Sequence, residues 1–162
     1  DPGPREKNGV HPTAPRLAAE GAPCPPGGAP AANYVPFVRT GNLLFTSGQL
    51  PLSGGKLVST GLLGRDLDTA AGQDAARACA INILAQVKAA TGDLEKIARI
   101  VKITVFVASA PGFTEQHLVA NGASDLLAKV LGERGRHARS AVGTASLPLD
   151  APVEVEAIVE LA

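Results

Sequence analysis

The stretch Ile100-Val101-Lys102-Ile103-Thr104-Val105-Phe106-Val107-Ala108-Ser109 gives the clearest strand signal in this 162-residue chain. Its alternation places Val101, Ile103, Val105 and Val107 on one face and Lys102, Thr104 and Phe106 on the other, because successive side chains of a strand point to opposite sides. The first face is uniformly apolar and β-branched, so another element has to cover it.

Two segments with helical periodicity flank this strand. Residues 69–91 carry a stripe of small and apolar residues at three- and four-residue steps, and Gly92 ends the pattern. That stripe consists of Ala76, Cys79, Ala80, Ile83 and Val87. Residues 114–131 form a second predicted helix that ends at Gly132, with an apolar stripe of Leu118, Leu126, Leu127 and Val130. Asn121-Gly122 weakens the middle of this second helix.

Further strands are expected on both sides of this unit. Residues 35–40 and 43–47 are short extended runs joined by Gly41-Asn42, which favours a two-residue hairpin turn. A short strand at 56–59 follows the turn Gly54-Gly55, and residues 139–145 and 153–161 supply the last two strands. The order β-β-(β)-α-β-α-β-β predicts an α+β domain with two helices on one face of a mixed sheet.

Residues 1–32 precede this domain and have a different composition. Eight of the thirteen prolines fall within residues 1–30, and proline blocks the interiors of both helices and sheets. We therefore expect a Pro/Gly-rich leader that is flexible or draped over the surface, with one or two helical turns in residues 15–21. The folded domain is expected to span residues 33–162.

Composition excludes several classes of protein. Fifteen Lys and Arg balance fifteen Asp and Glu, so the chain lacks the positive field that drives binding to nucleic acid or anionic membranes. No apolar run approaches the ~18 residues of a membrane span. Residues 1–30 lack the apolar segment of a signal peptide, so a cytoplasmic protein is expected.

Metals, cofactors and disulfides are not predicted. Cys24 and Cys79 alone form neither a disulfide framework nor a four-ligand zinc site. The three histidines, His11, His117 and His137, lack metal-ligand spacing, and no phosphate-binding glycine loop occurs. Aromatic residues make up only 3% of the chain. A small monomer would therefore be marginally stable.

The last two predicted strands carry the densest polar signal. Arg139 begins one strand with Ala141 as its neighbour on the same face, while Glu154 and Glu156 share a face of the other. A guanidinium on a rigid strand is suited to a bidentate grip on a carboxylate, and a nearby carboxylate can position or deprotonate a water. The pattern alone favours a different interpretation, a solvated sheet face with Arg–Glu pairs between the strands.

Two weaker signals lie near the start of the domain. Tyr34 is the only tyrosine, and a lone tyrosine is more often a packing residue than a catalytic one. Thr46-Ser47-Gly48-Gln49 supplies a hydroxyl and backbone donors for an anion or a carbonyl oxygen, although short Ser-Gly turns are common.

Several separated segments together resemble the RidA/YjgF family. Residues 41–51 (GNLLFTSGQLP) resemble its early hairpin, and residues 101–107 (VKITVFV) resemble its central strand. Its C-terminal signature is matched by residues 139–142 (RSAV), 147–148 (LP) and 153–157 (VEVEA). The resemblance covers about residues 33–162.

The resemblance implies a chorismate-mutase-like (ferredoxin-like βαβ) fold and a homotrimer with sites in the clefts between subunits. It also implies cofactor-independent hydrolysis of reactive enamines and imines, of the 2-aminoacrylate type, to 2-keto acids and ammonia. By position, Arg139 matches the arginine that holds the substrate carboxylate, and Glu154 matches the acidic residue that positions the attacking water. The implied substrate-binding positions are Tyr34, Ser47, Gly48, Asn121 and Ala141. Ala141 stands where archetypal members usually carry Cys, which bears on pocket volume and substrate choice.

Two alternatives to this deaminase remain open at the level of sequence. The first is a non-catalytic trimer that binds 2-keto acids or other small carboxylates. The second is the RNA cleavage or translation inhibition attributed to some family relatives. The local basic cluster Arg134, Arg136, His137 and Arg139 lacks interleaved aromatics, and together with the zero net charge this argues against RNA as a partner.

Overall fold

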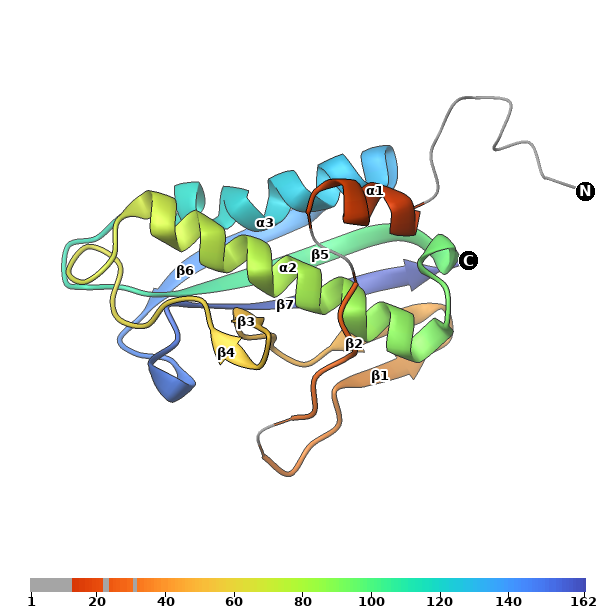
Figure 1. The fold of residues 1–162 in the computed structure, drawn as a ribbon, viewed down its shortest axis with the longest axis horizontal. Helices are drawn as coiled ribbons and strands as arrows, with labels where there is room; N and C mark the ends of the chain where they lie inside the picture. The colour runs from red at the N-terminus through yellow and green to blue at the C-terminus, as the bar shows by residue number, and fades with distance from the viewer. Residues whose placement is uncertain (1–12, 22–23, 31) are drawn as a thin grey trace, which may run out of the picture.

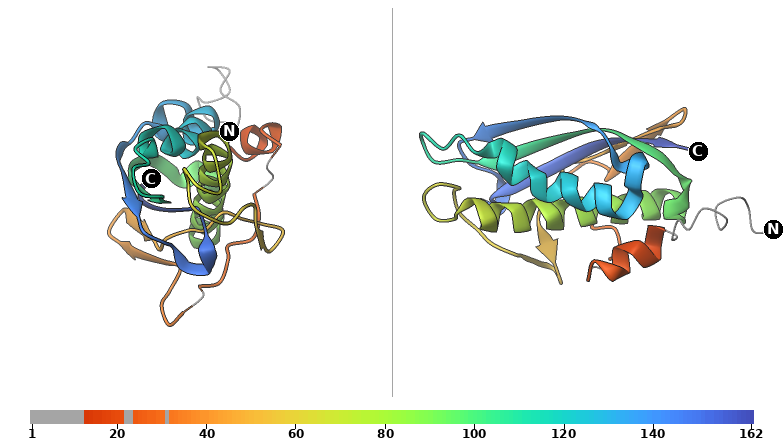
Figure 2. Two further views of the ribbon diagram at one scale, coloured as in Figure 1. Left: turned by 90° about the vertical axis from the view of Figure 1, so that its left-hand side faces the viewer. Right: turned by 90° about the horizontal axis from the view of Figure 1, so that it is seen from above.

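A five-stranded sheet with helices packed on one of its faces forms the body of the protein (Figure 1). The computed structural model describes residues 13–21, 24–30 and 32–162, so the first twelve residues of the predicted leader lie outside the described residues. The long helices α2 (Thr69–Thr91) and α3 (Gln116–Leu131) lie side by side on the same face, as Figure 2 shows from two further directions. Among the described residues, no helix is both long enough and apolar enough to cross a membrane.

The sheet is mixed, as predicted. Its strands are β1 (Phe37–Thr40), β2 (Leu43–Thr46), β5 (Ile97–Ala108), β6 (Ala138–Thr144) and β7 (Val153–Leu161), in the spatial order β1-β2-β7-β5-β6. β5 and β6 are parallel and are connected through α3, whereas the other pairs are antiparallel. The predicted short strand becomes a separate hairpin of β3 (Leu52–Ser53) and β4 (Lys56–Leu57). The predicted α+β architecture, a mixed sheet with two helices on one face, is thereby confirmed.

β5 differs from its prediction at one end. It begins at Ile97 rather than Ile100, and its pairing with β7 shifts register between Ile100 and Lys102. Ile103 and Val105 are fully buried on the helix-covered face as expected. Val101 is only half-buried, so its predicted place on that face is wrong, because the register shift gives Ile100 the buried position instead.

The predicted stripe of α2 is confirmed, since all five of its members are fully buried. Asp68 caps the helix by accepting a hydrogen bond from the Ala71 backbone N–H at 2.9 Å, and Gly92 ends it with φ 78°. In α3, three of the four predicted stripe residues, Leu126, Leu127 and Val130, are buried as expected. Leu118 is only half-buried, and Val119 and Ala120 are fully buried.

Gly122 lowers the helix propensity of α3, and the packing of α3 against α2 explains why a glycine is found there. A Cβ on Gly122 would lie 2.1 Å from the backbone oxygen of Gln73, so the two helices approach each other closely enough to exclude any side chain there. The glycine that weakens the helix locally is required by its packing against α2.

Replacing Gly122 by alanine therefore reverses the usual sign of such a change. Alanine in place of glycine normally stabilises a helix by ~1 kcal/mol. Here we expect a loss of about 1–3 kcal/mol in the free energy of unfolding, because the helices must separate. Urea denaturation measures this. Asp125→Ala, at an exposed position of the same helix, serves as the control and should change stability by less than ~0.5 kcal/mol. A more stable Gly122→Ala protein would contradict the close approach.

Part of the leader packs against the helices. Residues 13–19 form α1 (Thr13–Ala19), the predicted helical turns, and Leu17 is fully buried within the core. Arg134 Nη2 donates to Thr13 Oγ1 at 2.6 Å, and Gln86 Nε2 on α2 donates to the backbone oxygen of Gly28 at 2.9 Å. The described part of the leader thus runs across α3 and along α2.

Candidate functional site

Arg139 lies on β6, the edge strand beside α3, and three hydrogen bonds hold its side chain. Nη1 donates to Oδ1 of Asn121 at 2.9 Å and to Oγ of Ser124 at 3.1 Å. Nη2 donates to the backbone oxygen of His117 at 3.1 Å. All three acceptors belong to α3, so the planar guanidinium is fixed in orientation relative to the fold.

One edge of this guanidinium stays available. The three bonds use both hydrogens of Nη1 and one of Nη2, and within the described part of the chain Nε and the second Nη2 hydrogen of Arg139 have no acceptor. A guanidinium presents Nε–H and the adjacent Nη2–H parallel on one side, which is a geometry that a carboxylate accepts. The free donors of Arg139 can therefore bind a carboxylate.

Glu154 lies half-buried on β7 and has a perturbed carboxyl. Burial raises the pKa of Glu154 above its ordinary value, and repulsion from the neighbouring Glu156 raises it further. Gly48 lies directly against this carboxyl, because a Cβ on Gly48 would come within 2.2 Å of Oε2 of Glu154. A carboxylate with a raised pKa is a better proton acceptor than an ordinary one.

Arg139 and Glu154 face opposite sides of the sheet. Arg139 is paired with Ile103, which is buried under the helices, whereas Glu154 is paired with Phe106. Ile103 and Phe106 are an odd number of positions apart on β5, so they point to opposite faces. The interpretation of these residues as cross-strand Arg–Glu pairs is wrong, because β5 also lies between β6 and β7.

Two predicted residues accompany Arg139. Asn121 is bonded to it, and Ala141 lies two positions further along β6 on the same face, packed against the core. We call Arg139, Asn121 and Ala141 the arginine group.

The other predicted residues accompany Glu154. Ser47 and Gly48 follow the end of β2, and Ser47 Oγ donates to the backbone oxygen of Val35 at 2.7 Å. Tyr34 is 49% exposed and lines a pocket together with Ser47 and Gly48. We call Tyr34, Ser47, Gly48 and Glu154 the glutamate group. A single chain does not unite it with the arginine group.

The structure adds two residues that sequence reasoning missed. Ser124 Oγ lies 2.9 Å from Nε2 of His137, and Nδ1 of His137 lies 2.5 Å from the backbone oxygen of Gly135. A carbonyl oxygen only accepts, so Nδ1 carries a hydrogen. Ser124 Oγ therefore links the His137 ring to Arg139, from which it accepts a hydrogen bond. The spacing of Asn121 and Ser124 on one helix face, with His137 two positions before Arg139, is the signal that points to this network.

Metal binding has no support among the residues that the structure describes. There, no three His, Cys, Asp or Glu side chains come together in a way that would hold an ion. His11 lies outside the described residues.

Gly48 provides a test of the contact with Glu154. We expect Gly48→Ala to lower the raised pKa of Glu154 toward its ordinary value, because the new methyl group displaces the carboxyl from its half-buried place. An NMR titration of the Glu154 side chain measures the effect. An unchanged pKa would contradict the contact.

The fold is thus an α+β domain with an arginine held by α3 on one face of its sheet and a half-buried carboxyl on the other. The chain belongs to the YjgF/RidA family, since residues 14–161 match the family model described as "YjgF/chorismate_mutase-like, putative endoribonuclease".

Known relatives are similar over most of their length. Protein TCP17 of Trypanosoma cruzi is 54% identical over 142 residues, which is 87% of this chain and 89% of that protein. The crystal structure of Atu1372 from Agrobacterium tumefaciens, a protein of unknown function, is 60% identical, with a TM-score of 0.87 over 93% of this chain and 92% of that one. The structure of Escherichia coli TdcF with bound serine is 29% identical, with a TM-score of 0.59 over 86% and 94% of the two chains.

Proposed function

We propose that this protein hydrolyses reactive enamines and imines of 2-amino acids, such as 2-aminoacrylate, to 2-keto acids and ammonia without a cofactor. The observation that carries the proposal is the guanidinium of Arg139, which is held by three hydrogen bonds to α3 and has Nε–H and one Nη2 hydrogen left for a carboxylate among the described residues. Every 2-imino acid presents such a carboxylate next to the reacting carbon. The family membership and the half-buried Glu154 support the same reaction.

The site is completed by a second copy of the chain in a homotrimer. The arginine and glutamate groups lie on opposite faces of one sheet, so the glutamate group of one subunit has to meet the arginine group of the next. The helix-free face supports such an assembly because it carries a cluster of apolar side chains. Register places Val38, Phe45, Phe106, Val142 and Ile158 on it, and Val38 and Val142 are 54% and 45% exposed.

The chemistry needs only orientation and a proton acceptor. An enamine tautomerises to an imine, whose protonated form is already electrophilic at the carbon that bears nitrogen. Arg139 holds the carboxylate, and water adds to that carbon while Glu154 takes one of the water protons. Glu154 then returns the proton to nitrogen of the carbinolamine. The C–N bond breaks to release ammonia, which takes the hydroxyl proton as the C=O bond forms, so iminium and water yield keto acid and ammonium.

Binding without turnover is the second candidate function. It is favoured by the serine bound to TdcF, since serine is a small carboxylate that Arg139 could hold in the same way. The two functions are separated by assaying freshly generated 2-aminoacrylate. The deaminase should release ammonia and pyruvate well above the spontaneous rate, whereas the binder should bind pyruvate and leave that rate unchanged.

RNA cleavage, suggested by the family description, is disfavoured by the zero net charge.

The pH dependence of the reaction follows from Glu154. Its carboxyl has a pKa above the usual 4.5, and only the ionised form accepts a proton from water. We expect kcat/KM to fall on the acid side with a midpoint above 4.5, measured with a stable buffer series. An acid limb that persists unchanged in Glu154→Gln would assign the titration to another group.

A further inference from the structure

A pocket of about 800 Å³ lies on the α2 side of the sheet, between the leader, α2 and the β3–β4 hairpin. It shares Tyr34, Ser47 and Gly48 with the glutamate group, but neither Arg139 nor Glu154 lines it. Concave sites of this volume are typical of small-molecule binding. The pocket is therefore a candidate site for a second ligand, separate from the carboxylate that Arg139 holds.

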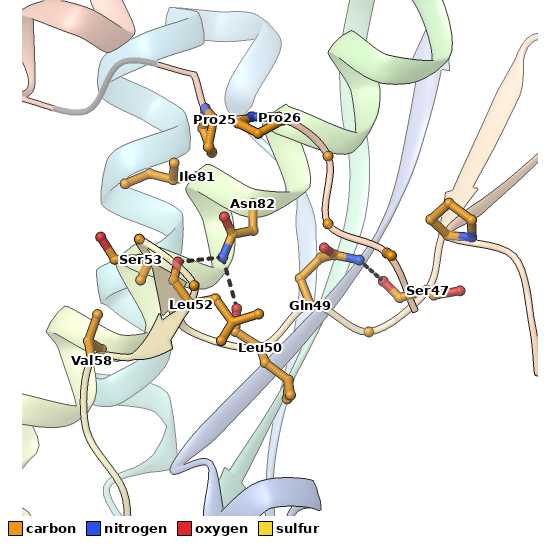
Figure 3. A pocket seen from close by; sticks show the side chains of 18 of the residues that line it. Pro25, Pro26, Ser47, Gln49, Leu50, Leu52, Ser53, Val58, Ile81 and Asn82 are labelled. Carbon is orange, nitrogen blue, oxygen red and sulfur yellow. Dashed lines mark hydrogen bonds between the residues drawn. The ribbon is translucent and has the colours of Figure 1, made fainter. Parts of the chain in front are cut away.

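Hydrogen bonds hold the walls of this pocket in place. Asn82 Nδ2 on α2 donates to the backbone oxygens of Leu50 and Leu52 at 2.9 and 3.0 Å, which fixes the β3–β4 hairpin against the helix (Figure 3). On the leader side, Gln86 Nε2 donates to the backbone oxygen of Gly28 at 2.9 Å. These walls are in place before any ligand enters, so binding does not have to order them.

Apolar side chains form a large part of the wall. Figure 3 shows Pro25 of the leader, Ile81 of α2 and Leu52 of β3 around the pocket. Leu149 also lines it, with φ 61° and a side chain that is 66% exposed. Residues other than glycine rarely adopt such a φ, and conformations of this kind concentrate at ligand sites. An apolar molecule in the pocket would cover these side chains.

Two opposite charges on α2 line the same pocket. Asp74 and Arg77 are three positions apart, so their side chains are neighbours on one helix face, with Cβ atoms roughly 5–6 Å apart. Within the described part of the chain, no ion pair joins them and Asp74 has no other partner. Arg77 Nη2 donates to the backbone oxygen of Glu20, which anchors the guanidinium and leaves Nε and Nη1 without an acceptor among the same residues.

We propose that this pocket binds a free α-amino acid with a large apolar side chain, such as phenylalanine. Its carboxylate accepts hydrogen bonds from the unused donors of Arg77, and its ammonium donates to Asp74. An α-amino acid carries both charges on one carbon, which matches two charged side chains that are neighbours on a helix. Ile81 follows Arg77 by four positions, so the apolar wall that takes the ligand's side chain begins on the same face of α2. This binding does not depend on the proposed reaction.

Calorimetric titration of the full-length chain with four probes tests the proposal. L-Phenylalanine should bind saturably. Phenethylamine lacks the carboxylate and 3-phenylpropanoate lacks the ammonium, so each should bind at least about tenfold more weakly for want of one charge-assisted contact. L-Alanine keeps both charges but lacks the ring and should be weaker by a similar factor, at least about tenfold. Absence of saturable phenylalanine binding, or equal affinity for the four probes, would overturn the proposal.

Variants distinguish this pocket from the site at Arg139. Asp74→Asn, at an exposed position, and Leu52→Trp, which fills the pocket from the partly exposed hairpin, should each weaken phenylalanine binding at least about tenfold. Asp125→Asn, exposed on α3 and outside the pocket, is the matched control for Asp74 and should keep the affinity. Arg139→Ala should keep it as well. Loss of binding in Arg139→Ala, or unchanged affinity in Asp74→Asn, would place the amino acid elsewhere and contradict the proposal.

Discussion

Arg139→Ala should lower kcat/KM for 2-aminoacrylate by at least about 100-fold, since truncating one partner of a charge-assisted bidentate contact costs roughly 2–5 kcal/mol. The loss should appear mainly in KM, because the carboxylate is held in both the ground state and the transition state. Arg139→Lys should recover little of it. A lysine keeps the charge but cannot replace the parallel N–H pair or donate to Asn121, Ser124 and His117 together.

The matched control for Arg139 is Arg136→Ala. Arg136 is a nearby arginine whose side chain is 74% exposed, and its weak contact with Glu133 at 3.6 Å contributes little. The control should keep wild-type kinetics. Equal losses in both variants would indicate a general effect of positive charge rather than a carboxylate receptor at Arg139.

Glu154→Gln should lower kcat by about 10²–10³-fold with a small change in KM, because general acid–base groups contribute on this scale to the chemical step. Glutamine keeps the size of the side chain and its place beside Gly48 but cannot take a proton. Glu160→Gln, at an exposed position on the same strand, is the control and should remain fully active. A large rise in KM with unchanged kcat would instead assign Glu154 to binding.

The same substitution should not destabilise the fold at neutral pH. The pKa of Glu154 is raised in the folded state, so above the unfolded value near 4.5 the folded chain holds the proton more tightly than the unfolded chain does. Glu154 therefore adds to the free energy of unfolding at low pH, and this contribution is lost as the pH rises through the folded pKa. Glutamine does not ionise, so Glu154→Gln avoids that loss. Thermal unfolding at pH 7 should therefore give a Tm equal to or above that of the wild type. A lower Tm would show that the ionised carboxylate stabilises the fold.

Most of the fold was predictable from local patterns. The alternation of β5 and the stripe of α2 each follow from burial of one face, and both reappear in the structure. The misplacement of Val101 came from a register shift, which depends on the partner strand and leaves no mark in the alternation itself. Leu118 was misplaced because the Asn121-Gly122 interruption hid the true stripe of α3. The need for Gly122 became visible only once α2 lay against it.

The candidate site residues could be named from the sequence, but their arrangement in space could not. The sequence shows that Arg139 and Glu154 lie on strands, yet strand order decides which faces they occupy, and β5 separates them. The role of Ser124 in holding Arg139 depends on helix α3 packing beside the β6 edge, a contact between elements. The pocket depends on the leader meeting α2, which no motif in either segment indicates.

The central claim is that one active site combines Arg139 of one subunit with Glu154 of the next. Co-expression of Arg139→Ala and Glu154→Gln chains with different tags, followed by purification of the mixed oligomer, tests it most directly. Each variant alone should be nearly inactive. In a cyclic trimer that contains both kinds of chain, one of the three sites combines both wild-type residues, so the purified mixed oligomer should regain about a third of wild-type activity. Activity that stays at the level of the separate variants would contradict a shared site.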